Sequence, residues 1–491
     1  MTLSQAPAVD FATRRAGMRR AFLLAAPCLL AIWTLALHLP FRGLRGPDDA
    51  FYVEVAHLWL SGAPPYLNAF DVKPPGYFAL LALAQAMFGP TLAALNGLTA
   101  ICEFATGLCL WRLGREFAGP AAGVFAAFGY PLLSCMLAAN PAYPPLALAT
   151  TAAFALAVAP WEWRRRVRLA GFAIGLAIAI KQTAGLEGLA LLWLLLREPE
   201  ARGRRLGTAL EFAAAALVAP LALALLLASE GALGPMLADV VAAAARRPTL
   251  ENDTASAVVW HFVNAQIMIW PLVALAAVGV ARLRALLPGA PVGRAEGLAL
   301  WLAAAWVELA LQHARWALYL GPTFAPLLLL AGAAMASAIR DEASKRVALA
   351  ALLLTTAIAA YPFRAWRFLG PDDDAAVAAA APAILARRPG PHDRLLAIHE
   401  GQELNFVVGL APPTRYFHWM HLICDFPGAG PQRLREALAA APRFIVAPRR
   451  SYRPYCVDPR AWPLIHAALT QDYRPLAQTP PFVVYERLTA R

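Results

Sequence analysis

The sequence predicts an α-helical polytopic membrane protein with a small α/β domain at its C-terminal end. Three observations carry this prediction. Of the 491 residues, 60% are hydrophobic and only 15% are charged, and the mean hydropathy is +0.53. Apolar runs recur through the first three quarters of the chain, as expected of bilayer-spanning helices of about 20 residues. After residue 363 the runs stop, and proline and charged residues become more frequent.

We expect about eleven spans in residues 1–363, which form the transmembrane domain. The first, near 21–41, follows four arginines, as a signal peptide would. It is too long for the apolar region of a signal peptide, and no A-x-A cleavage site follows, so a retained anchor is expected. The two short runs that flank Lys181 can also form one bent hairpin, which leaves the exact count open. The other ten spans are expected near 91–111, 120–137, 143–159, 169–180, 184–196, 206–227, 258–280, 297–312, 316–338 and 346–363.

The net charge of +12 mostly reflects the orientation of the chain in the membrane. Twenty of the 43 basic residues lie in six short loops on one predicted side, whereas the intervening loops hold seven and the last sixteen follow Tyr361. This bias is the positive-inside rule, so nucleic-acid binding is not needed to explain the charge. It predicts a cytoplasmic N-terminus. The first outer loop (42–90) and the C-terminal domain then lie on the outer side, which is the periplasm for a bacterial inner membrane.

Residues 364–491 are expected to form a periplasmic α/β domain. Three strand-like runs, Arg394–His399, Phe444–Ala447 and Phe482–Tyr485, are separated by stretches that include the helical run Pro431–Ala440. Strands that alternate with helical patterns indicate a small α/β domain of about 120 residues.

The six cysteines divide into two groups. Cys28, Cys102, Cys109 and Cys135 fall in spans, where a free cysteine behaves as a small hydrophobic residue. Cys424 and Cys456 fall in the outer domain, in an oxidising compartment. A disulfide between them is therefore favoured, although spacing alone leaves the pairing open.

The first outer loop contains two apolar segments, 48–61 and 75–88, that are too short to span a bilayer. Proline and glycine bound them. We expect two helices that lie at the membrane interface, with aromatic side chains at the depth of the lipid headgroups. These expected interfacial residues are Tyr52, Trp59, Tyr66 and Tyr77.

Asp48 and Asp49 open this loop, directly after the first span. One reading is a helix N-terminus, where acids cap backbone N–H groups and face the positive end of the helix dipole. The other reading is functional. Burying an unpaired acid near lipid costs free energy, so such acids tend to mark functional sites. The position beside a span, in a loop that also holds Lys73, favours the functional reading.

Lys73 lies in the sequence Asp71-x-Lys73-Pro-Pro-Gly76. A structural reading pairs Lys73 with Asp71 or extends its side chain to the interface, and takes Pro-Pro-Gly as the start of the next helix. A functional reading takes Lys73 as a point charge, held at a stiff corner, for a lipid phosphate.

Together, the motifs Asp48-Asp49-x-x-Tyr52-x-Glu54, Gly62-x-x-Pro-Tyr66 and Lys73-Pro-Pro-Gly resemble the first outer loop of the GT-C membrane glycosyltransferases. The similarity is greatest to the protein O-mannosyltransferase and aminoarabinose (lipid A) transferase group and covers about residues 46–90. It implies that Asp48 is the catalytic base, with Asp49 in place of the usual Glu, and that Lys73 contacts the donor phosphate. Substrate contacts by Tyr52 and Glu54 follow from the same resemblance, as does the layout of spans, interfacial helices and periplasmic domain.

Weaker similarities to the same group lie in later outer loops. Basic residues there hold the donor phosphate in relatives, a task that suits the bidentate fork of arginine. Solvated arginines or interfacial anchors would explain the same residues without function. The resemblance implies donor-phosphate binding by Arg246, Arg247 and Arg315, and substrate binding by Lys181, His313 and Tyr319.

The next outer loop departs from the group, because Asn140 stands where many relatives have a second acid. A metal held between two outer loops is therefore not predicted, and no cofactor is expected. Acids within spans are expected to make interhelical hydrogen bonds. Scattered histidines in an α/β domain are expected to be ordinary core or surface residues. The acids within spans are Glu103, Glu187 and Glu308. The outer-domain group consists of three histidines and one acid: His399, Glu400, His418 and His421.

The resemblance implies transfer of a sugar, with inversion, from a polyprenyl-phosphate donor to a lipid, glycan or protein acceptor at the periplasmic face. The first alternative is a transporter or flippase for a lipid-linked sugar. Transporters tend to show inverted repeats and broken helices near the midplane, and the polar clusters here lie at the outer ends of spans. The second alternative is a non-catalytic assembly protein, which would not need Asp48 or Lys73. Sugar, acceptor, lipid length and oligomeric state are left open.

Overall fold

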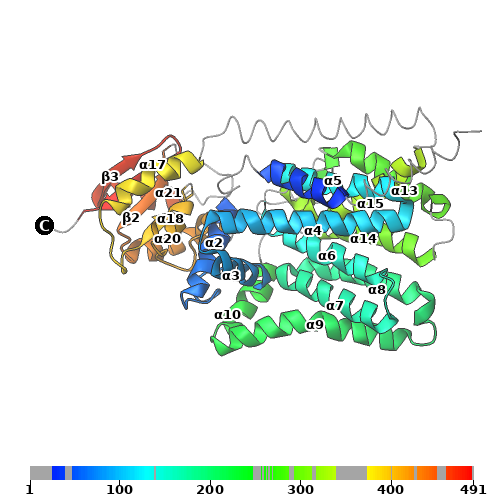
Figure 1. The fold of residues 1–491 in the computed structure, drawn as a ribbon. Helices are drawn as coiled ribbons and strands as arrows, with labels where there is room; N and C mark the ends of the chain where they lie inside the picture. The colour runs from blue at the N-terminus through cyan, green and yellow to red at the C-terminus, as the bar shows by residue number, and fades with distance from the viewer. Residues whose placement is uncertain are drawn as a thin grey trace, which may run out of the picture.

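In the computed structural model, the described residues are 25–38, 47–137, 140–246, 269–286, 292–311, 317–338, 373–399, 401–424, 428–449 and 460–488, with a few positions between 256 and 267. Long helices run alongside one another in a bundle, and a small α/β unit lies at one end of it (Figure 1). The predicted fold class, a helical membrane protein with a small C-terminal sheet, is confirmed. The predicted boundary at 363/364 lies outside the described residues.

Two of the described helices, α4 (Leu92–Ala118) and α9 (Arg205–Ser229), are long and apolar enough to cross a bilayer, and shorter apolar helices accompany them. The predicted span 346–363 and part of the predicted span 258–280 lie outside the described residues. The remaining bundle helices are Ala25–His38, α5 (Pro120–Leu137), α6 (Tyr143–Ala157), α7 (Trp163–Ile180), α8 (Gly185–Arg197), α13 (Trp270–Leu286), α14 (Val292–Leu311) and α15 (Gly321–Ala338). Short helical segments between them are η1 (Gln182–Ala184), η2 (Pro199–Ala201), α10 (Leu233–Leu237), η3 (Ala238–Ala243), α11 (Ala244–Arg246) and η4 (Ala317–Leu320).

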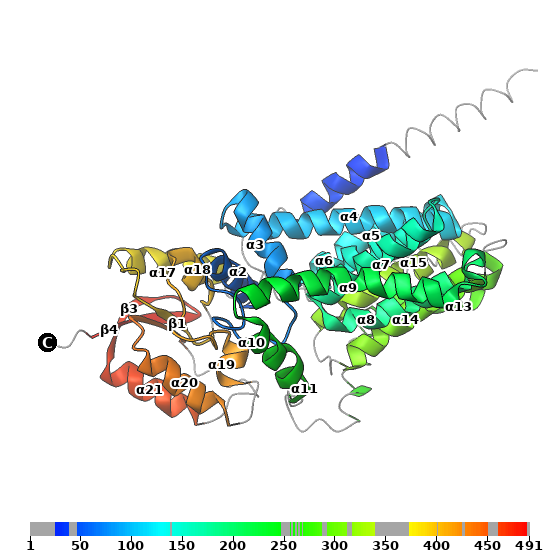
Figure 2. The same ribbon diagram turned by 90° about the horizontal axis from the view of Figure 1, so that it is seen from below.

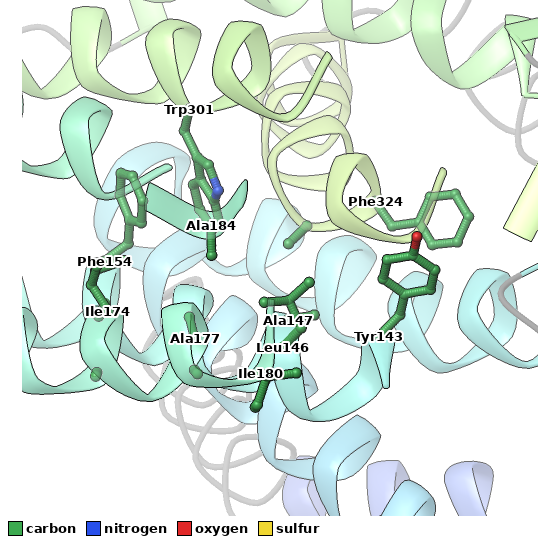
Figure 3. Close-up of a cluster of buried hydrophobic side chains, with 14 of the residues drawn as sticks. Tyr143, Leu146, Ala147, Phe154, Ile174, Ala177, Ile180, Ala184, Trp301 and Phe324 are labelled. Carbon is green, nitrogen blue, oxygen red and sulfur yellow. The ribbon is translucent and has the colours of Figure 1, made fainter. Parts of the chain in front are cut away.

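Small residues let the bundle helices approach closely. A Cβ atom at Gly175 in α7 would lie 2.3 Å from the carbonyl oxygen of Ala216 in α9, so only glycine fits there. Larger side chains fill the remaining space. The rings of Phe154 and Trp301 stack at 3.9 Å in the buried cluster of Figure 3, which also contains Tyr143. This packing is typical of membrane helices, which gain little from the hydrophobic effect between them.

Acids inside the bundle make interhelical hydrogen bonds, as predicted. Glu103 lies 2.7 Å from His38 and accepts a hydrogen bond of 2.8 Å from Ser134. Glu187 accepts from the indole N–H of Trp301. Glu308 accepts from Thr183 at 2.7 Å. These polar side chains link helices across an apolar interior.

The first outer loop forms the two expected helices, α2 (Pro47–Leu60) and α3 (Gly76–Phe88). The prediction that their aromatic residues face the lipid headgroups is wrong for three of the four. Tyr52, Tyr66 and Tyr77 are buried because they pack on one another and on neighbouring segments; the rings of Tyr52 and Tyr77 lie 5.2 Å apart. Trp59 is half-buried, and its indole N–H donates to Glu230 at 3.0 Å.

The C-terminal unit is a four-stranded sheet with helices on both faces. The strand order is β1-β2-β4-β3; β1 and β2 are parallel and the other pairs are antiparallel. Helices α17 and α18 pack on one face, and α20 and α21 pack on the other (Figure 2). The elements are α17 (Asp373–Leu385), β1 (Leu395–Ala397), α18 (Glu403–Val408), α19 (Trp419–Ile423), α20 (Gly430–Ala439), β2 (Phe444–Pro448), α21 (Ala461–Gln471), β3 (Tyr473–Gln478) and β4 (Phe482–Arg487).

Three of these strands and helix α20 match the runs identified in the sequence. The sequence did not indicate β3, an edge strand that is mostly exposed and contains Pro475. Proline is tolerated in a sheet at such an edge, where its missing N–H breaks no ladder.

Cys424 is disulfide-bonded, whereas Cys28, Cys102, Cys109 and Cys135 are thiols that form no disulfide. Cys456 lies outside the described residues. The pairing of Cys424 with Cys456 therefore stays a prediction.

Candidate active site

Asp48, near the first residue of α2, is held by two N–H donors from distant parts of the chain. The side-chain amide of Asn140 donates to Oδ2 at 2.8 Å, and Nε2 of His418 lies 3.1 Å from Oδ1. The amide orientation of Asn140 is fixed, because its own oxygen accepts the backbone N–H of Ala142 at 3.0 Å. The side chain of Asp48 remains 35% exposed. The carboxylate is thus fixed in place and open on one side.

The environment keeps Asp48 ionised. Burial disfavours the charge, but the hydrogen bond from His418 and the electrostatic effects of His418, Lys73 and His421 outweigh it and hold the pKa of Asp48 well below its usual range. Donors that bond the charged form of a carboxyl lower its pKa in this way.

Lys73 lies in the same region. Its Nζ is 3.4 Å from Oδ1 of Asp71 and 5.1 Å from the centre of the Tyr52 ring. Burial opposes the charge, but Asp71 first and then Tyr52 and Asp48 raise the pKa of Lys73 well above its usual value. The pairing with Asp71, one of the two sequence readings, is therefore present. Lys73 is nevertheless 32% exposed, so the pairing leaves part of its ammonium group open.

Two contacts hold the loop that carries Lys73 in place, one before and one after this residue. The hydroxyl of Tyr66 donates to the backbone oxygen of Lys73 at 2.7 Å. Gly76 follows the two prolines, and a Cβ there would lie 2.4 Å from the carbonyl oxygen of Ala179 in α7. Only glycine permits this approach, so the Pro-Pro-Gly corner both starts α3 and locks the loop against the bundle.

The other predicted residues of α2 have different surroundings. Tyr52 is buried; its ring lies beneath Lys73, and its hydroxyl lies 3.4 Å from the amide nitrogen of Asn140. Asp49 and Glu54 are also buried. Glu54 lies on a different face of α2 from Asp48, since six residues correspond to well over one and a half turns. Burial raises the pKa of Glu54 to about 8. The fold therefore groups Asp48, Tyr52 and Lys73 and leaves Glu54 apart.

A second cationic cluster surrounds Lys181, between α7 and η1. Its Nζ donates to the hydroxyl of Tyr143 at 2.7 Å and lies 3.5 Å from Glu308. It also lies 4.3 Å from the ring centre of Tyr143 and 5.6 Å from that of Tyr319. Burial lowers the pKa of Lys181 to about 8, against the opposing effect of Glu308. The fold thus brings together Lys181 and Tyr319, two of the predicted substrate-binding residues.

The two cationic regions are neighbours. The side-chain amide of Gln182 donates to the backbone oxygen of Val72 at 3.4 Å, which joins the corner after Lys181 to the loop that carries Lys73. Arg246 ends α11, and its side chain lies outside the described part of the structure, as do Arg247, His313 and Arg315 altogether. Their roles stay predictions.

Histidines of the C-terminal unit reach the site, which the sequence did not indicate. His418 contacts Asp48, and Nε2 of His421 lies 3.8 Å from Oδ1 of Asp71. Both are buried, as expected of core residues, but 370 positions separate His418 from Asp48 along the chain and only folding joins them. The local signal was their spacing of three, which brings the two rings within 5.0 Å of each other at the start of α19.

Within the described residues, no group of three or more His, Cys, Asp or Glu side chains is arranged to hold a metal ion. Both oxygens of Asp48 face N–H donors. Asp48 is therefore not part of a metal-holding group among these residues.

Comparison with known proteins gives a consistent result. Residues 72–228 match the family model of the dolichyl-phosphate-mannose-protein mannosyltransferases. The structure is similar to ArnT from Cupriavidus metallidurans bound to undecaprenyl phosphate, with a TM-score of 0.65 and 16% sequence identity over 96% of this chain and 98% of that one. The apo form of the same protein gives a TM-score of 0.64 with the same identity and coverage. The chain has the GT-C fold.

A further match is the arabinofuranosyltransferase AftD from Mycobacteria, with a TM-score of 0.52 and 15% identity over 96% of this chain and 40% of that one. No curated protein matches the chain. The likeness to ArnT covers almost the whole of both chains, so the C-terminal unit is part of the shared architecture. The GT-C fold that the resemblance in the first outer loop implied is thereby confirmed.

Proposed function

We propose that the protein is a glycosyltransferase that moves a sugar from a polyprenyl-phosphate donor to an acceptor at the outer face of a bacterial inner membrane. One observation carries the proposal: Asp48 is held ionised and partly exposed, near the partly exposed ammonium group of Lys73. The family-model match and the GT-C fold support the same class of enzyme. The ArnT structure was obtained with undecaprenyl phosphate bound, which supports a lipid-phosphate donor.

The geometry suits a direct displacement. A nucleophilic oxygen of the acceptor attacks the anomeric carbon of the donor sugar, a new C–O bond forms, and the bond to the phosphate oxygen breaks. The bonding electrons leave with the polyprenyl phosphate, and the acceptor proton passes to the carboxylate of Asp48. Attack opposite the leaving group inverts the anomeric carbon.

Asp48 needs to be ionised rather than strongly basic, because the attacking oxygen becomes acidic as its new bond forms. The departing phosphate keeps its negative charge and requires no general acid. A fixed cation beside it lowers the barrier electrostatically, and we assign this task to Lys73.

The remaining predicted residues are proposed to act around these two. Lys181, next to Tyr143 and Tyr319, offers a second cation near the Lys73 loop. Arg246, Arg247, Arg315 and His313 are proposed donor or substrate contacts on sequence grounds. Tyr52 is buried and supports Lys73 from beneath.

The outer side is assigned from the distribution of charge. Helices α2 and α3 and the C-terminal unit lie at the same end of the bundle (Figure 1). The arginine-rich stretches 164–168, in the first turns of α7, and 197–205, from the end of α8 onward, lie at the opposite end of these helices from Lys181, and the positive-inside rule places that end in the cytoplasm.

The test compares wild-type protein with Asp48→Asn in liposomes that contain a panel of polyprenyl-phosphate sugars and an envelope extract as acceptor. Loss of a general base lowers the rate by about 10²- to 10⁴-fold, so transfer by Asp48→Asn should fall by at least about 10²-fold. The matched control is Asp472→Asn, which makes the same chemical change at an exposed position of the C-terminal unit and should keep full activity.

Two results would overturn the proposal. Equal activity of Asp48→Asn and wild type would remove Asp48 from the reaction. Movement of the lipid-linked sugar across the bilayer without any transfer would identify a flippase instead.

A further inference from the structure

His418 has a position that the proposed reaction does not yet explain. It precedes α19 in the C-terminal unit, yet its Nε2 lies 3.1 Å from Oδ1 of Asp48 in the first outer loop. Its residue surface is only 5% exposed. A buried imidazole behind a partly exposed carboxylate is placed to act on that carboxylate, not on a substrate.

The direction of the hydrogen bond can be assigned. An ionised carboxylate only accepts, so Nε2 of His418 carries the proton and donates. Among the described residues, none bonds its Nδ1, so the imidazole makes its side-chain hydrogen bond to Asp48 through Nε2.

Asn140 and His418 act on different oxygens of Asp48, since Asn140 donates to Oδ2 and His418 to Oδ1. Two donors in two directions fix both the position and the plane of the carboxylate. Neither donor alone would prevent rotation about the Cβ–Cγ bond. The exposed part of Asp48 is then presented in one orientation.

The segment that carries His418 is anchored to the first outer loop at its start. Arg415 donates to the backbone oxygen of Tyr66 and forms an ion pair with Asp239. The backbone oxygen of Arg415 in turn accepts the N–H of Phe70 at 2.8 Å. These contacts hold residues 415–421 against the loop.

Packing fixes the imidazole ring itself. The ring of Phe51 in α2 lies 4.9 Å from that of His418 and 4.9 Å from that of Phe417. Gln402 donates to the backbone oxygen of Phe417 at 2.9 Å. His418 therefore has little freedom to leave Asp48.

We propose that His418 is a positioning residue of this active site, which fixes the orientation of the Asp48 carboxylate, so that the C-terminal unit completes the catalytic centre. The inference rests on the proposed function, in which Asp48 receives the acceptor proton. The charged and titratable groups around the pair are Lys73, Asp71, Tyr52 and His421. None of them replaces the contact of His418 with Oδ1.

The variants His418→Gln and His418→Asn separate this role from simple packing. The amide nitrogen of glutamine can reach the position of Nε2, whereas that of asparagine reaches only the position of Nδ1. Glutamine should therefore keep kcat within about fivefold of wild type, and asparagine should lower it by about 10- to 100-fold, the effect of one lost hydrogen bond to a charged group. His466→Gln, at an exposed position of α21, is the control and should match wild type.

The pH profile provides a readout that a packing role would not move. Ionised Asp48 is the active form, so kcat/KM falls as pH drops through the pKa of Asp48. Wild type and His418→Gln should keep kcat/KM constant down to about pH 4, the usual range of aspartate. Loss of the donor in His418→Asn should move the acid limb to higher pH.

A labelling experiment tests the same point without activity. A hydrophobic carbodiimide reacts with protonated carboxyl groups, and peptide mass spectrometry reports the modified fraction of Asp48 at each pH. His418→Asn should be labelled at a higher pH than wild type and His418→Gln. Identical labelling and identical acid limbs in wild type and His418→Asn would overturn the proposal, as would equal losses in the glutamine and asparagine variants.

Failure of the proposed function gives a different pattern. If wild-type protein transfers no sugar, the glycosyltransferase assignment fails, and labelling still decides whether His418 keeps Asp48 ionised.

Discussion

The two ends of the helix bundle use charged residues in opposite ways. At the arginine-rich end, Glu198 is shared by two cations: Arg294 donates to it at 2.9 Å and Arg166 at 3.2 Å. Arg166 also donates to Glu200, and Arg294 to Glu116. Arg166 and Glu198 are buried. The central pair, Arg166 and Glu198, is therefore closed to solvent, whereas Glu200 and Glu116 at the edge of the network are 44% and 42% exposed.

At the other end, the charged side chains are paired but remain partly exposed to solvent. Asp48 accepts hydrogen bonds from His418 and Asn140, and Lys73 forms an ion pair with Asp71. About a third of the side chain of Asp48, and of that of Lys73, is nevertheless exposed. Paired charges that face solvent on one side can still meet a ligand. The comparison teaches that pairing alone does not separate a structural charge from a functional one. Asp48 and Lys73 differ from the central pair Arg166 and Glu198 in that each keeps a side open to solvent.

The largest expected effect is on activity, from Lys73→Gln. We expect transfer to fall by about 10²- to 10³-fold, the cost of removing one electrostatic contact to developing charge. Initial rates of sugar transfer measure this effect. The midpoint of thermal unfolding should change little, because Lys73 is partly exposed and its buried partner Asp71 still accepts the backbone N–H groups of residues 72 and 73. A variant that unfolds early yet retains full specific activity would place Lys73 with the structural charges.

Glu198→Gln should show the reverse behaviour. It leaves two arginines facing each other at a buried position, and breaking a buried ion pair typically costs about 3–5 kcal/mol. The midpoint of thermal unfolding in detergent should fall clearly, whereas the specific activity of the folded fraction should match wild type. Loss of activity without loss of stability would contradict the division between the two ends.

A smaller effect concerns Lys181, which is more buried than Lys73. Burial lowers its pKa to about 8, so the side chain is charged below that pH and neutral above it. If Lys181 binds donor phosphate, the KM for donor should rise above pH 8. Lys181→Arg should abolish this rise, since arginine stays charged throughout the range. A flat KM between pH 6.5 and 9.5 in wild type would exclude the charge of Lys181 from donor binding.

The smallest expected effect is that of metal removal. Among the described residues, no group of three or more His, Cys, Asp or Glu side chains is placed to hold a cation at Asp48, whose oxygens accept from Asn140 and His418. We expect chelation by EDTA to change the transfer rate by less than about twofold, because no bound cation is needed to stabilise charge that Lys73 already faces. Loss of activity with EDTA that Mn²⁺ restores would show that the site rearranges to bind metal.

Local features of the site followed from the sequence because each depends on neighbouring residues. The bounds of α2 and α3 were predicted within about two residues, the usual uncertainty at helix ends, from short apolar segments bounded by proline and glycine. The pairing of Lys73 with Asp71 was one of two readings, and it spans only two positions. The buried aromatic residues were mispredicted, because the same amphipathic pattern suits a lipid headgroup layer and a protein interface.

The sequence by itself determined that the chain is a bundle of apolar helices, which end of the bundle is rich in arginine, and that Asp48 and Lys73 lie in one loop between helices. Hydropathy and charge distribution record these properties locally. Only the tertiary structure decided that Asn140 and His418 meet at Asp48, since they lie 92 and 370 positions away along the chain. No local pattern encodes such contacts, because they exist only when the C-terminal unit packs against the first outer loop.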